Sequence, residues 1–321
     1  FTVSNNSSLA ITANLVVTPL YTIGSLVCPG PVQNFVFTVN PTPAVNAPLD
    51  QVVCNGLPTA IVSFVGTGTS YNWTNSQTSI GLNATGTGNI LPFNAMNASS
   101  SAVISNIVVT PQFTGSGVTC SGNPQNFNIT VNPSPNLLPI NPISICNNTA
   151  LNVNLASDLT SSFVWQALAT SNVNGEDSLA QTSSVINNTL TNITTIPQNV
   201  QYTVTPTSIP QGCVGTSLNF TVTVIPDVIL SIPTAIEICS GSAVNALLSA
   251  NVSSNFSWFT TFNNPNVTGE SITVNTGAII NDILINNSAT NQLVIYSVTP
   301  TSINGSCLGL AQTVAVTIKP P

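Results

Sequence analysis

One sequence pattern recurs four times along the chain and constrains its fold more than any other feature. In each copy a cysteine is followed, seven residues later, by a segment in which apolar and polar residues alternate until a proline is reached. One copy consists of Cys120, the apolar residues Phe127, Ile129 and Val131, and the ending Asn132-Pro133-Ser134-Pro135. A period of two predicts a half-buried β-strand, and the closing proline predicts a strand that leaves its domain.

Several independent landmarks keep one register. The cysteines of the pattern, here called tail cysteines, are Cys28, Cys120, Cys213 and Cys307, at spacings of 92, 93 and 94 residues. A second set, the head cysteines, is Cys54, Cys146 and Cys239, each followed 19 residues later by a tryptophan. Shared spacing of this kind indicates an internal repeat. We therefore expect the C-terminal part of repeat 1 (1–43), followed by repeat 2 (44–135), repeat 3 (136–226) and repeat 4 (227–321).

Within repeat 2 the apolar alternation and the turn residues predict short strands and no helix. The expected strands are 51–54, 60–65, 70–74, 90–97, 103–110 and 127–131. About seven short strands in a domain of this size predict an all-β fold, an antiparallel β-sandwich of immunoglobulin-like type. The linkers Pro41-Thr42-Pro43 and Pro133-Ser134-Pro135 are short and extended, so we expect the sandwiches to form an end-to-end array.

The charge content excludes several functions. Only 3 % of the residues are charged, where about 25 % is usual, and Lys319 is the only cation in a chain of net charge −7. Nucleic acids and anionic membranes are bound through Lys and Arg, so we expect no nucleic-acid partner. No apolar run reaches about 18 residues, so we expect no membrane insertion. The chain does not start with Met, and we expect it to be a piece of a longer protein.

The combined motif resembles a known repeat family. Its parts are the head cysteine, an aromatic-x-Trp triplet, Val-Thr-Pro, the tail cysteine and the closing strand. The triplets are Tyr71-Asn72-Trp73, Phe163-Val164-Trp165 and Phe256-Ser257-Trp258. This order is similar to the PKD-like immunoglobulin-fold repeats of giant Bacteroidota surface proteins, above all the gliding-motility adhesins exported by type IX secretion. The resemblance implies an extracellular, cell-surface protein. Many PKD domains have Trp-Asp-Phe-Gly-Asp, whereas Trp73 precedes Thr74-Asn75-Ser76, so no role of those acids is carried over.

Few residues suggest a chemical site. We expect the aromatic residues Tyr71, Trp73, Phe163, Trp165, Phe256 and Trp258 to fill cores, although exposed rings could stack on sugars. The eight carboxylates look scattered and there is no His, so we expect no enzyme, no metal and no cofactor. Asp177-Ser178-Leu179 resembles the Bacteroidota O-glycosylation pattern, which makes Ser178 a candidate acceptor. The many Asn-x-Ser/Thr sequons are attributed to the abundance of these residues.

The seven cysteines are expected to form disulfides, the usual state in a secreted chain. Three connectivities respect the period. Bonds within a repeat join Cys54 to Cys120, Cys146 to Cys213 and Cys239 to Cys307. Consecutive bonds join pairs such as Cys28 and Cys54. Bonds between repeats join Cys54 to Cys213 and Cys146 to Cys307.

The expected topology favours the bonds between repeats. Head cysteines precede a turn at one end of the sandwich and tail cysteines lie in a hairpin at the other, about 20 Å away, whereas bonded cysteines need Cα atoms within about 7 Å. The within-repeat alternative remains open, because it depends on the strand assignment.

Two functions are compatible with the sequence. The first is a structural segment of an extracellular adhesin filament or stalk, whose repeats contact their neighbours and hold a binding region away from the cell. With so little charge to repel copies, lateral self-association is expected. The alternative is a module that binds surface polysaccharide through loops of the repeats.

Overall fold

The computed structural model describes residues 2–321, and it confirms the all-β class. The one helical segment in this range is a single 3-10 turn, η1 (Thr78–Ile80). The chain divides into two compact units, one formed by residues up to Pro135 together with Ser208–Val214, the other by Asn136–Thr207 with Gly215–Pro321. In the described part of the chain, no helix has the length and hydrophobicity needed to cross a membrane. The repeat boundaries given above stay predictions.

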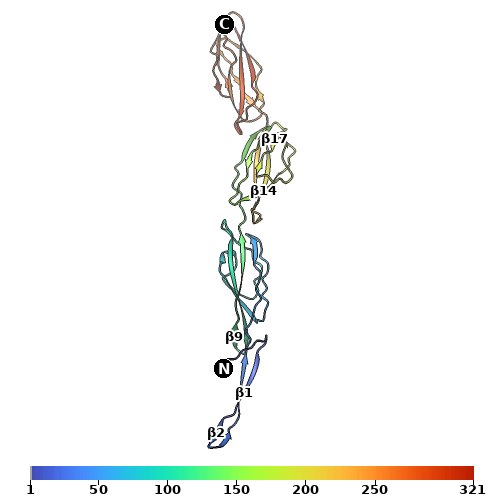
Figure 1. Ribbon diagram of the computed structural model, residues 1–321. Helices are drawn as coiled ribbons and strands as arrows, with labels where there is room; N and C mark the ends of the chain where they lie inside the picture. The colour runs from blue at the N-terminus through green and yellow to red at the C-terminus, as the bar shows by residue number, and fades with distance from the viewer. Residues whose placement is uncertain (1) are drawn as a thin grey trace. The chain divides into compact units, whose positions relative to one another are not determined.

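Repeat 2 contributes the largest sheet of the first unit. Its strands are β5 (Gln51–Cys54), β6 (Ser70–Asn75), β7 (Thr85–Thr87), β8 (Val103–Gly115), β9 (Val118–Ser121) and β10 (Gln125–Asn132). The order is β5-β10-β8-β6-β7. Strand β9, which Figure 1 labels, forms a hairpin with β8. All pairs are antiparallel except that β5 runs parallel to β10, with Cys54 opposite Asn132. The head of the repeat is thereby joined to its closing strand.

Two of the predicted strands in repeat 2 are wrong. Neither 60–65 nor 90–97 forms a continuous strand; strand pairing is limited to isolated bridges, Val62 with Ile90 and Pro58 with Asn94. Side chains take over the neighbouring backbone bonds: the Phe64 N–H donates to Asn89 Oδ1 at 2.9 Å and the Phe93 N–H to Thr59 Oγ1 at 3.1 Å. The apolar alternation was identified correctly, but Asn and Thr compete with a continuous ladder.

Repeat 1 has the closing strand pair without a partner sheet. Its strands are β1 (Ile11–Val17), β2 (Leu20–Ile23), β3 (Leu26–Pro29) and β4 (Gln33–Val39), paired as β1 with β4 and β2 with β3. Leu15 lies opposite Phe35 in this ladder. Phe35 is 50 % exposed, whereas its counterpart Phe127 in repeat 2 is 2 % exposed. The periodic pattern therefore forms the hairpin in repeat 1, but it does not bury the apolar face.

The second unit holds repeat 4 and all of repeat 3 except Ser208–Val214. Repeat 3 contains β11 (Ile143–Cys146), β12 (Thr149–Ala150), β13 (Val153–Asn154), β14 (Ser161–Ala167), β15 (Val173–Asn174), β16 (Val185–Ile186), β17 (Thr189–Asn192), β18 (Gln198–Ser208) and β19 (Leu218–Ile225). Repeat 4 contains β20 (Leu230–Ser231), β21 (Ala235–Cys239), β22 (Ser242–Ala243), β23 (Ala246–Leu247), β24 (Ser249–Ala250), β25 (Ser254–Thr260), β26 (Val267–Thr268), β27 (Asn275–Thr276), β28 (Ile279–Ile280), β29 (Ile283–Asn286), β30 (Gln292–Ser302) and β31 (Gln312–Lys319).

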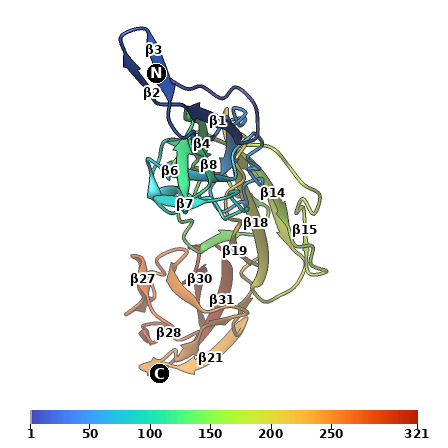
Figure 2. The same cartoon turned by 90° about the horizontal axis from the view of Figure 1, so that it is seen from below.

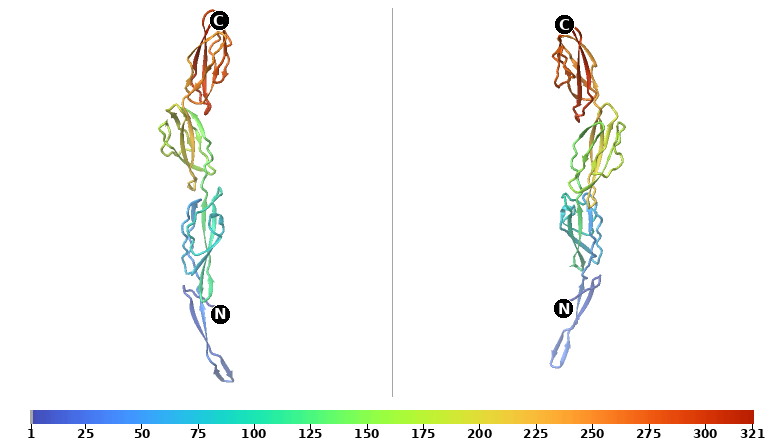
Figure 3. Two further views of the ribbon diagram at one scale, coloured as in Figure 1. Left: turned by 180° about the vertical axis from the view of Figure 1, so that it is seen from behind. Right: turned by 45° about the horizontal axis from the view of Figure 1, so that its top comes forward.

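Both repeats keep the topology of repeat 2. Their main sheets have the orders β11-β19-β18-β14 and β21-β31-β30-β25-β27, and the first strand again runs parallel to the last. Figure 2 shows β30 beside β31. Small sheets face these main sheets, of order β12-β17-β15 in repeat 3 and β22-β29-β26 in repeat 4. Figure 3 shows in two further views that repeats 3 and 4 consist of strands joined by loops.

The cores form where the inward residues of the two sheets meet. Every second residue of β18 and of β30 is buried along most of the strand, as the period-two pattern predicts. In repeat 3, Trp165 contacts Tyr202, whose ring stacks on Phe220 at a centroid distance of 5.3 Å. In repeat 4, Trp258 meets Tyr296 edge to face at 5.8 Å. Each such large side chain contributes roughly 1.5 to 3 kcal/mol through burial.

Candidate functional site at the ends of the repeats

The head cysteines are positioned by the parallel pairing of the first and last strands. Cys54 ends β5, and Cys146 and Cys239 end β11 and β21. Their partners in the ladder are Asn132, Ile225 and Lys319, each of which is directly followed by a proline. Each head cysteine therefore lies at the C-terminal end of its repeat, beside the linker.

The tail cysteines of repeats 3 and 4 lie in a hairpin at the opposite end. The N–H of Cys213 donates to Ser208 Oγ at 3.1 Å, and the N–H of Cys307 donates to Ser302 Oγ at 2.9 Å. Both cysteines are buried. Repeat 2 differs, because Cys120 belongs to strand β9 and pairs with Phe113. The same serine-anchored turn thus presents the sulfur in two of the repeats.

The structure contains two disulfides, and both join a head cysteine to the tail cysteine of the next predicted repeat. Cys54 is bonded to Cys213 and Cys146 to Cys307, with Cα separations of 5.5 and 5.4 Å, inside the usual range. Cys28, Cys120 and Cys239 are unbonded in residues 2–321. None of the within-repeat or consecutive pairs occurs among these residues.

The sheet geometry explains why Cys54 does not meet Cys120. Cys54 is level with Asn132, the last residue of β10, whereas Cys120 precedes Gln125, the first residue of that strand. The eight residues of β10 span about 25 Å at about 3.3 Å per residue. A disulfide needs Cα atoms within about 7 Å, so the sheet holds the two sulfurs too far apart.

Apolar side chains surround the disulfide of the second unit. Cys146 and Cys307 pack with Ile225 and Val228, and with the partly buried Val252. A polar contact lies in the same region: Asn251 Nδ2 donates to the carbonyls of Thr195 at 2.9 Å and Asp227 at 3.1 Å. In the first unit, Asn40 Nδ2 likewise donates to the carbonyls of Gly115 and Val118. In each unit, a side-chain amide of one repeat therefore donates to a backbone carbonyl of the neighbouring repeat.

A set of buried asparagines, which the sequence analysis attributed to composition, occupies one equivalent position in every repeat. These are Asn5, Asn97, Asn192 and Asn286, each the first residue of an Asn-x-Ser/Thr sequon. Each Nδ2 donates to the carbonyl of the closing strand, for example Asn97 to Val131 at 2.7 Å. Each Oδ1 accepts from the backbone N–H two residues later. The spacings of 92, 95 and 94 residues carry this signal, so attributing all sequons to chance is wrong.

One pair of carboxylates follows the repeat, so the expectation that all eight are scattered is wrong for this pair. Glu176 and Glu270 are 94 residues apart, and each accepts a backbone N–H from the residue six positions earlier, at 3.0 and 2.6 Å. Burial, together with the charge of Asp282, raises the pKa of Glu270. Burial raises the pKa of Tyr296, whose hydroxyl donates to Asp282 at 2.8 Å. These acids close loops, and no group of three or more metal-ligating side chains occurs within residues 2–321.

The remaining candidate residues divide into buried and exposed ones. Trp73, Trp165, Trp258, Phe163 and Phe256 are buried in the cores, and Tyr71 is half-buried against one. The Trp73 and Trp165 indoles donate to backbone carbonyls, at 3.1 and 3.0 Å. Ser178 lies in an exposed loop, so its hydroxyl is open to solvent; its glycosylation stays a prediction.

Two segments of the chain match a known protein family. Residues 143–228 and 236–321, together more than half of the chain, match the family model of the PKD-like domain. No curated protein matches. Among solved structures, an I-band fragment of titin is 12 % identical, with a TM-score of 0.39 over 87 % of this chain and 98 % of that one. A Drosophila N-cadherin fragment, EC1-4, is 12 % identical, with a TM-score of 0.34 over 97 % and 83 % of the two chains. The family match shows that the chain belongs to the PKD-like domain family.

Proposed function

We propose that this chain is a structural repeat segment of an extracellular adhesin, which acts as a stalk whose junctions are held by disulfides. The observation that carries the proposal is the bonding of Cys146 to Cys307 inside the apolar cluster of Ile225 and Val228. A second bond of the same type joins Cys54 to Cys213. Such bonds restrict the motion of one repeat against the next, which is what a stalk under load requires.

Composition and family support the extracellular setting. Disulfides persist in oxidising compartments, and PKD-like domains are typically structural modules without catalysis. With one Lys and no Arg, the chain offers almost no site to trypsin-like proteases. Within this proposal, the resemblance to Bacteroidota gliding-motility adhesins supports a cell-surface location and type IX export. Antibody labelling of intact source cells tests that location, and label found only after permeabilisation would contradict it.

The partners that follow from a stalk are neighbouring repeats of the same chain and other copies alongside. The low charge removes most of the repulsion that keeps copies apart. Sedimentation of the oxidised chain at increasing concentration tests lateral association; a monomer at every concentration would oppose it.

The decisive experiment concerns the disulfides. Peptide mapping of the chain, purified from an oxidising compartment without reductant, should find Cys54 linked to Cys213 and Cys146 linked to Cys307. X-ray scattering should then show a broader distribution of dimensions for the Cys146→Ser/Cys307→Ser variant than for the wild type. Cys28→Ser is the matched control, because Cys28 is exposed and unbonded. Finding Cys54 linked to Cys120, or identical scattering for all variants, would refute the proposal that disulfides hold the junctions of the stalk.

A further inference from the structure

Two cysteines that fit the pairing rule of this chain have no partner within residues 2–321. Each disulfide joins the head cysteine of one repeat to the tail cysteine of the next. Cys239 is the head cysteine of repeat 4 and Cys28 is the tail cysteine of repeat 1, and both are exposed and unbonded. Cys239 of one molecule and Cys28 of another are therefore the same kind of pair as the two that are bonded.

The backbone of repeat 1 places Cys28 as repeats 3 and 4 place their bonded tail cysteines. All four tail cysteines belong to a Cys-x-Gly segment, and the glycine N–H donates to the carbonyl of the proline in Val-Thr-Pro. This bond is 2.7 Å long from Gly30 to Pro19, and 2.8 and 2.9 Å long in repeats 3 and 4. Cys28 thus lies two residues before the common anchor, in the exposed strand β3.

The hairpin that carries a bonded tail cysteine lies against the end of the previous repeat. A Cβ added at Gly305, in the hairpin of repeat 4, would lie 3.3 Å from Ile225 Cγ1 and 3.7 Å from Ser144 Cβ. Ile225 lies opposite the head cysteine of repeat 3 in the parallel ladder. We call the residue at this ladder position the seat residue of its repeat.

The seat residue of repeat 1 contacts the hairpin of repeat 2 in a similar way. It is Asn40, whose Nδ2 donates to the carbonyls of Gly115 at 2.9 Å and Val118 at 3.0 Å. The hairpins of repeats 1 and 2 share a long form, in which the cysteine follows its proline by nine positions instead of seven. In repeat 1 the residues equivalent to Gly115 and Val118 are Ile23 and Leu26, which pair with each other as those two do.

Lys319 is the seat residue of repeat 4, and it supplies the kind of donor that Asn40 supplies. It lies opposite Cys239 in the ladder. Its exposed ammonium is 3.0 Å from the carboxylate of Glu237. An ammonium has three N–H donors, so two are left for other acceptors. The only cation of the chain therefore stands beside the unbonded head cysteine, where a long hairpin would present two carbonyls.

We propose that the end of repeat 4 that carries Cys239 and Lys319 binds the cysteine hairpin of repeat 1 of a second copy of this chain. Lys319 donates to the carbonyls of Ile23 and Leu26, and Cys239 forms a disulfide with Cys28. The two thiols give up two protons and two electrons to a small-molecule disulfide such as oxidised glutathione, which becomes two thiols. Because the step joins two molecules, concentrated protein forms head-to-tail oligomers while dilute chains stay single.

The inference goes beyond the proposed stalk, because the internal disulfides form without it. Its test is oxidation of the full chain in a glutathione buffer at rising concentration, up to about 1 mM, with half of the molecules labelled with ¹⁵N. Peptide mapping should find Cys28 linked to Cys239 in products that combine a labelled and an unlabelled peptide, which only a bond between two molecules gives. Absence of this link while both internal disulfides are intact counts against the inference and leaves the stalk standing.

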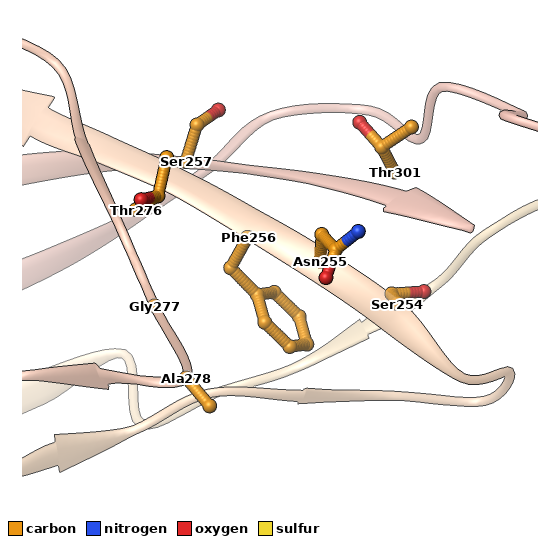
Figure 4. Close-up of a pocket in the computed structure, with 8 residues that line it drawn as sticks. All are labelled: Ser254, Asn255, Phe256, Ser257, Thr276, Gly277, Ala278 and Thr301. Atoms are coloured by element: carbon orange, nitrogen blue, oxygen red, sulfur yellow. The ribbon is translucent and has the colours of Figure 1, made fainter. Parts of the chain in front are cut away.

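Paired variants separate docking from random collision of thiols. All chains carry Cys120→Ser; one keeps Cys239 through Cys28→Ser, and the other keeps Cys28 through Cys239→Ser. The mixture should link at least about tenfold faster than either chain alone. A third chain, with Cys28→Ser, Cys239→Ser and Asn255→Cys, moves the thiol to an exposed position of β25, beside the pocket of about 570 Å³ in Figure 4. It should show no such acceleration.

Two replacements of Lys319 test the donor. Lys319→Leu should slow the linkage about tenfold, whereas Lys319→Gln keeps an amide like that of Asn40 and should stay within about twofold of the wild type. Both replacements remove the charge, so their difference measures the N–H donor. The proposal is overturned if the mixture links no faster than its components, if the Asn255→Cys chain links equally fast, or if Cys28 and Cys239 are joined only within one molecule.

Discussion

Replacing Asn192 by Ala removes a buried carboxamide that ties a turn to the closing strand of repeat 3. Its Nδ2 donates to the carbonyls of Ile196 at 2.8 Å and Val224 at 2.9 Å. Its Oδ1 accepts from the N–H and the hydroxyl of Thr194, at 2.9 and 2.8 Å. The side chain is only 4 % exposed, so water cannot reach the groups it leaves behind without opening the turn.

The size of the effect follows from these four contacts. The bond to Val224 is buried, and an orphaned buried carbonyl costs about 1 to 3 kcal/mol. The bonds to Ile196 and Thr194 are nearer solvent, where water replaces much of what is lost. We therefore expect Asn192→Ala to lower the free energy of unfolding of repeat 3 by about 2 to 3 kcal/mol.

Hydrogen exchange of the full chain, followed by mass spectrometry, measures this effect locally. The amides of β19 should exchange roughly 30 to 150 times faster in Asn192→Ala, because about 1.4 kcal/mol corresponds to a factor of ten. The amides of β31 in repeat 4 should be unaffected. Asn286→Ala should give the reverse pattern, since Asn286 makes the equivalent bonds to Thr290 and Ile318.

Asn187→Ala is the control, because Asn187 also begins an Asn-x-Ser/Thr sequon but is exposed. It should exchange like the wild type. If β19 exchanges in Asn192→Ala as it does in the wild type, the idea that the sequon asparagines stabilise the closing strands is refuted. If Asn192→Ala raises the amide exchange rates of β19 and β31 equally, the stabilisation by Asn192 is not confined to repeat 3.

Two further predictions concern a partly buried acid and a glycine. Burial raises the pKa of Glu270, so its contribution to stability is fully present below the unfolded value near 4.5 and is lost as pH rises through the folded pKa. Glu270→Gln should thus raise the melting temperature near pH 7 and leave it unchanged near pH 4; a loss at pH 7 would contradict this sign. A Cβ at Gly86 would lie 2.0 Å from Trp73, so Gly86→Ala should destabilise repeat 2 by about 2 kcal/mol or more in exchange of β8. Gly88→Ala, where a Cβ meets nothing within 4 Å, should cost about 1 kcal/mol through its positive φ alone, and equal effects would refute the clash.

The sequence predicts four strands of the main sheet of repeat 2 well, because their pattern is set by burial on one face. The prediction 51–54 coincides with β5, and the predicted strands 70–74, 103–110 and 127–131 lie within β6, β8 and β10. The predictions fail at 60–65 and 90–97, where Asn89 and Thr59 bond to the backbone instead of leaving it to the ladder. Hydrophobic alternation predicts which residues face inward. It does not predict where polar side chains accept backbone N–H groups and so prevent strand pairing.

Residues that act through their place in the repeat are visible only when the copies are aligned. The sequon asparagines and the pair Glu176 and Glu270 keep the period, so comparing equivalent positions would have found them. The indole N–H of Trp258 is buried and has no hydrogen-bond partner within residues 2–321, whereas those of Trp73 and Trp165 donate to backbone carbonyls. The sequence gives no signal of this difference, because the tryptophan and its strand are the same in all three complete repeats. What differs is one backbone angle at Gly277. Equivalent residues of repeated domains can therefore differ in their hydrogen bonds through the local backbone, and such differences are not visible in the shared sequence pattern.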